Sequence, residues 1–361
     1  MPSGISRGHP SQGKPGEPES LIAEILERHR AFWLRTSTDR PLVRIAPWQD
    51  WRPFPSLVLR DGTIMKEAAE IRPGMLDRLA NLEVIRPRTL VEGDFINGWG
   101  PYDCCWTEAI LGCCVRRVGP SVWADQLVQT WDEVDNLSWD EPNPWLGELL
   151  EVNRVLVQET QGAFPVCQPL MRGPLDMVEA AVPTEALYSG FYDNADPLRR
   201  LLELCTDIFI TVAKRRLAET PPFHSGYGVR FEYGLWAPGS VVQFQADAML
   251  NLSPQTYREF MFEFDRRIAS QFEYSLIHTH SGSAHILPVL SDEPALTAIE
   301  VTLDPAPYGP PPLELLPNFL MVQQAGKALL ISGPMKRSEF DTLLDRLSPV
   351  GLAIRAGLIP E

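Results

Sequence analysis

The last third of the chain repeats one pattern, a short apolar segment followed by a segment with helical periodicity. The predicted strands are residues 241–246, 274–278, 298–303, 328–332 and 351–355, and a helix is predicted over 254–272. A further short buried strand is predicted earlier in the chain, at residues 164–169. Strands of this length that alternate with helices indicate parallel β-α-β units, which are joined by right-handed crossovers. A series of five or more such units favours closure over an open sheet. We therefore predict an α/β fold of the (β/α)8 TIM-barrel type with an extended N-terminal segment.

The length of 361 residues is compatible with one large domain, which we place at residues 21–361. Residues 1–20 are rich in Gly, Pro and Ser and lack the apolar centre of a signal peptide. We expect them to form a flexible tail on a cytoplasmic protein.

The net charge of −15 argues against nucleic acid as a partner, because phosphates bind to basic surfaces. No apolar run approaches the roughly 18 residues that a membrane-spanning helix needs. The chain also lacks the glycine-rich motifs of dinucleotide and nucleotide triphosphate binding, and the Gly-x-Ser-x-Gly motif of hydrolases. These absences favour a small-molecule substrate, no nucleic-acid partner and no membrane partner.

Two histidines end the second predicted strand, in the run Tyr-Ser-Leu-Ile-His-Thr-His-Ser-Gly of residues 274–282. Residues two apart on a strand point to the same face, so His278 and His280 should project together from its carboxyl end. Paired imidazoles in such a place are typical of a metal or acid–base site. The alternative is two polar side chains that bond the backbone at the rim of a barrel.

Other titratable residues follow the carboxyl ends of further predicted strands, where the sites of TIM barrels are built. They are Arg172, Asp247, Glu300 and Asp304, and Glu232 joins them from a preceding loop. A loop rich in glycine and aromatic residues, 93–102, suits the rim of a pocket, and its Trp99 and Tyr102 are candidates for substrate binding.

Two chemical interpretations fit these residues. In the first, His278, His280 and one carboxylate, from Asp247, Glu300 or Glu232, bind Zn²⁺ with an open fourth position. Such a metal lowers the pKa of a bound thiol or water. In the second no metal is present, and the histidines act with Asp247 on an organic acid held by Arg172. Both leave His278, Asp247 and Arg172 as catalytic candidates.

Several segments resemble the uroporphyrinogen decarboxylase superfamily. Residues 247–260, from Asp to Ser-Pro-Gln-Thr-Tyr-Arg-Glu-Phe, are similar to its Asp…Ser-Pro-x-x-Phe-x-Glu-Phe segment. Ile-His-Thr-His at 277–280 resembles its strand that ends in His-x-Cys-Gly. Similar stretches are Leu-Leu-Ile-Ser-Gly-Pro at 329–334, Thr-Glu-Ala-Ile-Leu-Gly at 107–112 and Met-Arg-Gly-Pro at 171–174. The resemblance extends from about residue 90 onward and independently implies a (β/α)8 barrel.

The resemblance implies one of two activities. One is cofactor-free decarboxylation of uroporphyrinogen, and the other is zinc-dependent methyl transfer between a corrinoid protein and a thiol, with one His and two Cys as ligands. The decarboxylase signature Arg-Gln-Ala-Gly-Arg is absent here. The second methyltransferase ligand position holds His280 instead of Cys, Ser281 follows it instead of Gly, and no cysteine lies beyond Cys205.

We therefore predict an enzyme of this superfamily with a methyltransferase-like, metal-assisted activity that is linked to a corrinoid or a thiol. Its cofactor would be zinc, its substrate a small or tetrapyrrole-like molecule, and its partners a corrinoid protein and a second copy in a homodimer. The alternatives are a metal-free carboxy-lyase of the uroporphyrinogen decarboxylase type and a barrel that binds a ligand without catalysis.

Overall fold

The structure is a computed structural model that describes residues 19–48, 64–65, 84–85, 89–101, 104–118, 121–230 and 232–361. Helix α1 (Glu19–Leu34) begins within the predicted tail, because Glu19 and Ser20 form part of its first turn. The rest of that predicted tail, and the predicted pocket residue Tyr102, lie outside the described residues.

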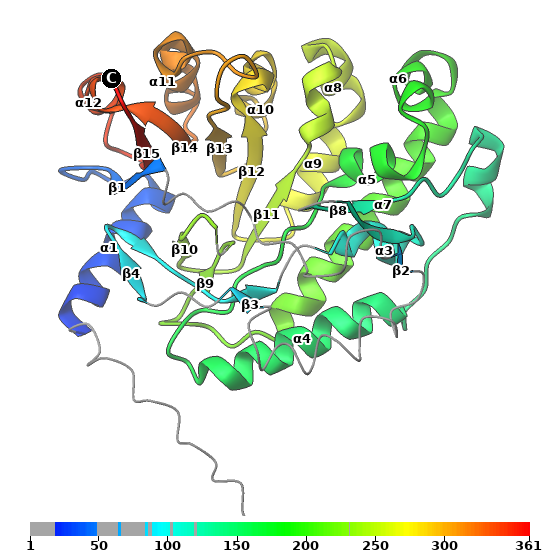
Figure 1. Cartoon of the computed structure of the whole chain (residues 1–361), viewed down its shortest axis with the longest axis horizontal. Helices are drawn as coiled ribbons and strands as arrows, with labels where there is room; N and C mark the ends of the chain where they lie inside the picture. The colour runs from blue at the N-terminus through cyan, green and yellow to red at the C-terminus, as the bar shows by residue number, and fades with distance from the viewer. Residues whose placement is uncertain are drawn as a thin grey trace, which may run out of the picture.

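Six parallel strands form the main sheet (Figure 1). Their order is β1 (Leu42–Pro47), β15 (Leu352–Ile359), β14 (Ala328–Lys336), β13 (Ala298–Thr302), β12 (Tyr274–His280) and β11 (Val241–Gln245). All five neighbouring pairs are parallel. The strand–helix alternation predicted for the last third of the chain is therefore confirmed, and β1 joins the sheet from the other end of the chain.

The two faces of this sheet differ in composition. One face carries Phe244, Ile277, Ile299 and Ile331, which belong to the large core shared with the helices. The opposite face carries apolar side chains, several of them alanines, at the amino ends of the strands. At the carboxyl ends it becomes polar, with Gln243, Gln245, His278, His280, Glu300, Thr302, Ser332 and Arg355. Because side chains alternate between the two faces along each strand, one face packs against the helices and the other carries the polar and titratable side chains.

Helices connect consecutive strands and lie along the outer side of the sheet (Figure 1). They are α8 (Pro254–Phe260), α9 (Phe262–Ala269), α10 (Leu287–Ser291), α11 (Leu316–Gln324) and α12 (Arg337–Arg346), with short 3-10 turns η4 (Asp247–Asn251), η5 (Ser281–Ile286) and η6 (Pro312–Leu315). Ser253 caps α8 by accepting the amide of Thr256, and Pro254 occupies its first turn. The single helix predicted over 254–272 is interrupted at Met261.

The part of the chain between β1 and β11 is mainly helical among the described residues. Its helices are α3 (Trp106–Leu111), α4 (Pro144–Thr160), α5 (Pro174–Ala181), α6 (Thr184–Asp193) and α7 (Ala195–Ala218), with the 3-10 turn η3 (Trp131–Asn136). Short antiparallel pieces accompany them: β2 (Ile64–Met65) with β7 (Val115–Val118) and β8 (Ser121–Ala124), β3 (Val84–Ile85) with β6 (Gly100–Pro101), β4 (Val91–Glu92) with β5 (Phe95–Ile96), and β9 (Tyr227–Gly228) with β10 (Trp236–Ala237).

The predicted strand at 164–169 is present only as isolated parallel bridges. Val166 pairs with Trp99, Gln168 with Arg230, and Arg172 with Gln245 on β11. These single bridges continue the parallel arrangement beyond β11, but within the described ranges they do not make a continuous ladder. The α/β architecture with a parallel sheet is thus observed, whereas an eight-stranded closed barrel is not shown by the described residues.

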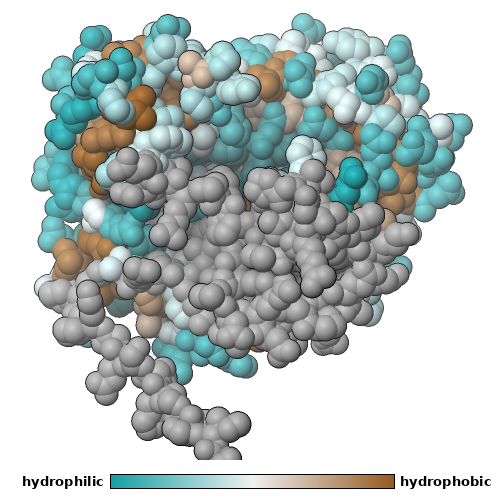
Figure 2. All heavy atoms as spheres, viewed as in Figure 1, coloured by the Kyte–Doolittle hydropathy of each residue, from teal (hydrophilic) through white to brown (hydrophobic). Residues whose placement is uncertain are grey.

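Hydrophilic residues cover most of the described part of the face seen in Figure 2, and hydrophobic residues form separate patches. Large side chains exposed singly include Trp123, Tyr192 and Tyr308. Among the described helices, none combines the length and the apolar character needed to cross a membrane.

Candidate active site

The register of the sheet places the two histidines of β12 beside one carboxylate on β13 and close to a second one just after it. His278 is the partner of Glu300, and His280 is the partner of Thr302, two residues before Asp304. Both imidazoles therefore lie on the polar face, as the spacing in the sequence predicts.

Asp247 completes a group of three possible metal ligands. It follows β11 as the first residue of η4. The Nε2 atoms of His278 and His280 are 3.3 Å apart, and Asp247 Oδ1 lies 3.7 Å from the first and 3.8 Å from the second. One ligand atom from each residue lies within 4.8 Å of the others, and this is the group of possible metal ligands found among the described residues.

Each histidine is oriented from behind by a carboxylate. Nδ1 of His278 is hydrogen-bonded to Oε2 of Glu300, a side chain with no exposed surface. Nδ1 of His280 lies 2.8 Å from Oδ1 of Asp304. Ionised carboxylates only accept hydrogen bonds, so Nδ1 of each histidine is the nitrogen that carries hydrogen, and Nε2 presents a lone pair whenever the ring is neutral.

The two carboxylates are themselves fixed. Thr302 donates to Oε1 of Glu300 at 2.8 Å, and Ser281 donates to Oδ2 of Asp304 at 3.1 Å. The backbone amide of Asp304 in turn donates to the Ser281 hydroxyl at 2.9 Å. Chains of this kind lock the orientation and tautomer of metal-binding histidines.

The three converging atoms form a place where a bound cation would be stabilised. Two nitrogen lone pairs and a carboxylate oxygen repel one another at these distances unless a proton or a metal ion lies among them. Burial disfavours protonation of His280, but the Asp304 hydrogen bond and the charge of Asp247 outweigh it and raise the pKa of His280 to about 9. Burial also favours the neutral form of Asp304, yet His280 lowers the pKa of this acid.

Asp247 is held by residues that the sequence did not single out. Gln245 donates to its Oδ2 at 2.8 Å. On α5, Asp176 accepts the amide of Ala248 at 3.0 Å and so fixes the turn that presents Asp247. Burial, with the charge of Asp247, raises the pKa of Asp176 to about 8. An acidic residue in the first turn of a helix is common, so the sequence carried no signal for this contact.

Arg172 adjoins the group but is already bonded. Its backbone forms an isolated parallel β-bridge with Gln245 on β11. Its side-chain Nη1 donates to Glu108 at 2.7 Å and contacts Cys105 Sγ at 3.2 Å. Glu108 has no exposed surface. A substrate carboxylate at Arg172 would have to compete with this buried partner.

The remaining predicted residues lie elsewhere. Glu232 forms a two-armed ion pair with the buried Arg230, which also reaches Gln245 at 3.5 Å. Trp99 is half-buried and stacks on Phe164 with ring centroids 5.5 Å apart. Glu300 stands behind His278 and is not part of the three-residue group. Asp247 is thus the carboxylate whose position fits a metal ligand.

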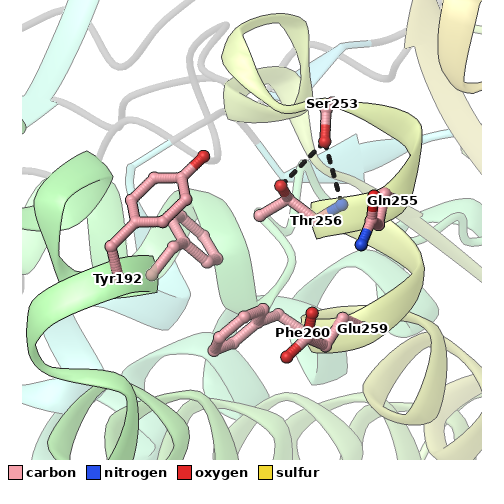
Figure 3. A pocket seen from close by; sticks show the side chains of 7 residues that line it. Tyr192, Ser253, Gln255, Thr256, Glu259 and Phe260 are labelled. Carbon is pink, nitrogen blue, oxygen red and sulfur yellow. Dashed lines mark hydrogen bonds between the residues drawn. The ribbon is translucent and has the colours of Figure 1, made fainter.

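A separate hollow of about 410 Å³ lies between α6 and α8 (Figure 3). Tyr192, Glu259 and Phe260 contribute to its lining, and Ser253 is bonded to Thr256 at its edge. None of the residues that line it belongs to the histidine group.

The donor set fits a first-row divalent metal. Two imidazole nitrogens and one carboxylate oxygen are the set found in many catalytic zinc sites, and it also suits iron(II). The side chains of Asp247 and His280 are 43% and 37% exposed, so an additional ligand could approach from solvent.

Comparison with known proteins gives a relation at the level of the fold. No protein-family model and no curated protein matches the chain. A methyltransferase from Methanosarcina mazei is similar in structure, with a TM-score of 0.58, 14% sequence identity and 92% of each chain covered. The chain therefore shares a methyltransferase-like fold. The similarity does not single out uroporphyrinogen decarboxylase, and membership of the superfamily stays a prediction.

Proposed function

We propose that this chain is a metal-dependent enzyme with a methyltransferase-like group-transfer activity, and that Asp247, His278 and His280 hold its Zn²⁺ ion. The observation that carries the proposal is the convergence of two Nε2 atoms and one carboxylate oxygen. The fold shared with a methyltransferase supports the class of reaction. The substrate would be a small molecule with a thiol, alone or with a corrinoid protein as partner.

Bound Zn²⁺ would act as a Lewis acid that lowers the pKa of a thiol or water and so supplies a nucleophile. The chain's own residues prepare the place for it. Glu300 and Asp304 keep Nδ1 of each histidine protonated, which directs both Nε2 atoms to one point. Gln245 and Asp176 keep Asp247 at the third position. Deep burial of Glu300 and His278 excludes water from one side of the site.

Zinc titration of the purified chain, followed by dialysis and elemental analysis, tests the proposal. We expect one zinc per chain, and a loss of affinity of more than roughly 100-fold in His278→Ala, His280→Ala and Asp247→Ala, because removal of a direct ligand exceeds the effect of removing an orienting group. His285→Ala is the matched control, since this exposed histidine bonds the carbonyl of Leu252 instead. Unchanged zinc affinity in the three site variants would reject the site.

A metal-free carboxy-lyase is the second candidate. The observation in its favour is the His280–Asp304 pair, which is partly exposed and has the geometry of a proton donor with its counter-ion. An assay for decarboxylation after exhaustive chelation separates the two candidates, because a lyase of this kind turns over without a metal ion.

A further inference from the structure

Three side chains of one tight turn, Arg230, Glu232 and Tyr233, lie beside the residues that support the histidine site. The amide of Tyr233 donates to the carbonyl of Arg230 at 3.0 Å and closes the turn. Arg230 and Tyr233 are each 2% exposed, and the side chain of Glu232 is 8% exposed. None of the three belongs to the group of possible metal ligands. Their contacts with the site therefore run through other side chains.

The guanidinium group of Arg230 is held in one orientation by a carboxylate. Its Nε and Nη2 donate to the two oxygen atoms of Glu232, the second at 2.9 Å. A planar guanidinium group that binds a carboxylate with two parallel hydrogen bonds has a fixed direction. The remaining nitrogen, Nη1, donates to Oε1 of Gln245 at 3.5 Å. Glu232 thus directs the third arm of Arg230 toward β11.

Arg230 in turn decides how the amide group of Gln245 is oriented. A guanidinium group only donates hydrogen bonds, so the amide has to present its oxygen to Arg230 and its NH₂ group to the opposite side. On that side, Nε2 of Gln245 donates to Oδ2 of Asp247 at 2.8 Å. The other oxygen, Oδ1, is the one that lies 3.7 Å and 3.8 Å from the two histidine Nε2 atoms. This contact therefore leaves Oδ1 of Asp247 for a metal ion.

The ring of Tyr233 contacts both Arg230 and His278. The guanidinium carbon of Arg230 lies 5.4 Å from the centroid of the Tyr233 ring, within the range of a cation–π contact. The centroids of the Tyr233 and His278 rings are 6.2 Å apart, and their planes are inclined by 31°. The Tyr233 hydroxyl is buried and has no hydrogen-bond partner among the residues that the structure describes. Tyr233 thus acts on His278 through its ring.

We propose that Arg230 is a positioning residue for two of the candidate metal ligands. It acts on Asp247 through Gln245, and on His278 through Tyr233. This inference rests on the proposed function, because it explains how two ligands of the proposed Zn²⁺ ion are kept in place. Loss of an outer partner of a metal ligand typically costs roughly 10- to 100-fold in metal affinity. An effect of that size is open to direct measurement.

A double-mutant cycle on zinc affinity tests this role. Arg230→Met together with Glu232→Met removes both charges, so that neither is left buried without a partner. Gln245→Met is the second change, and a third variant combines all three substitutions. We expect a loss of roughly 10-fold or more in each of the first two variants, and little further loss in the third, because Arg230 acts through Gln245. Competition with a zinc chelator gives the affinities, and circular dichroism of the metal-free variants verifies folding.

Arg230→Lys covers the case in which the replacement of the ion pair does not fold. It keeps the charge beside Glu232, but a single ammonium group lacks the planar fork that binds the carboxylate and reaches Gln245 together. We expect this variant to lose part of the zinc affinity.

The Tyr233 contact is tested with two substitutions and a control. Tyr233→Leu should lower the zinc affinity, whereas Tyr233→Phe should retain it, because the ring is kept and the hydroxyl makes no hydrogen bond with the described residues. Arg337→Gln with Asp341→Asn removes an exposed ion pair on α12 and should leave the affinity unchanged.

The positioning role of Arg230 is wrong if its folded variants bind zinc as the wild type does, or if the losses in the cycle are fully additive. Wild-type affinity in Tyr233→Leu would overturn the contact with His278. In each of these cases zinc binding that still depends on Asp247 and His278 leaves the proposed function intact. A wild-type chain that binds no zinc would instead reject the proposed function, and this role with it.

Discussion

At the scale of single residues, the site depends on which ring nitrogen of each histidine carries hydrogen. Glu300 and Asp304 decide this by accepting from Nδ1, and neither is within the three-residue metal group. A site of the same composition without these carboxylates would lose the common direction of its two Nε2 atoms. The orienting pair is therefore as much a part of the proposed chemistry as the ligands.

Glu300→Gln and Asp304→Asn test this dependence. Each removes a negative charge while it keeps the shape of the side chain, and removal of an orienting partner typically costs 10- to 100-fold in metal affinity. We expect zinc affinity to fall within roughly that range for either variant. Glu314→Gln, at an exposed position, is the control. Competition with a zinc chelator gives the affinities, and values equal to the wild type would mean that the carboxylates are only structural.

The sequence identified most of these residues and few of their contacts. His278, His280 and Asp247 were found because strand alternation and strand ends are local properties. Asp176 was not found, because its contact with Ala248 joins residues far apart in the chain. The ion pair between Arg172 and the buried Glu108 was not predicted either, because the two residues are far apart in the sequence.

At the scale of elements, the turn before α5 must pass very close to β11. The amide of Gly173 donates to the carbonyl of Gln245 at 2.9 Å. A Cβ at Gly173 would lie 2.3 Å from that same oxygen, a distance at which backbone has to move. This close approach brings Arg172 and Asp176 to the end of the strand that precedes Asp247.

Gly173→Ala should consequently destabilise the protein. We expect a loss of about 1–3 kcal/mol in the free energy of unfolding, the usual cost of forcing extra volume into a packed site. Gly147→Ala on α4 is the matched control, because a Cβ there meets no atom within 4 Å. It should stabilise the helix by about 0.5–1 kcal/mol. Chemical denaturation of both variants measures the difference, and a neutral Gly173→Ala would contradict the contact.

Where the periodicity was strong, the sequence predicted whether a segment is a helix or a strand. It did not predict the residues at which each element begins and ends. The strands of the last third of the chain were predicted near their observed positions, but β12 and β14 continue beyond their predicted ends. The long helix predicted over 254–272 divides at Met261, near the point where Tyr257 donates to the buried Asp265 at 2.6 Å. Such interruptions are decided by tertiary contacts, which periodicity does not contain.

At the scale of the whole molecule, α1 joins two segments that are far apart in the sequence through one buried histidine. Nε2 of His29 lies 2.8 Å from the carbonyl of Asp94, and its Nδ1 accepts the amide of Trp236 at 3.1 Å. The neutral ring satisfies both bonds, whereas the protonated ring has no acceptor to offer Trp236. Burial lowers the pKa of His29 to about 4.

This histidine should make stability depend on pH. Because the folded state binds the proton less tightly than the unfolded chain, the stabilisation is complete above pH 6.5 and is lost as the pH falls toward 4. The shift corresponds to a loss of about 3 kcal/mol. Urea denaturation at several pH values should show a shallower pH dependence in His29→Gln than in the wild type. Identical slopes would mean that His29 does not titrate as described.

X-ray absorption at the zinc edge of the zinc-loaded chain tests the central claim most directly. The account predicts nitrogen and oxygen neighbours at about 2.0–2.1 Å, with scattering from two imidazole rings and no sulfur from the protein. A shell of sulfur atoms at about 2.3 Å in the absence of added thiol, or a spectrum with fewer than two imidazoles, would contradict the assignment of Asp247, His278 and His280.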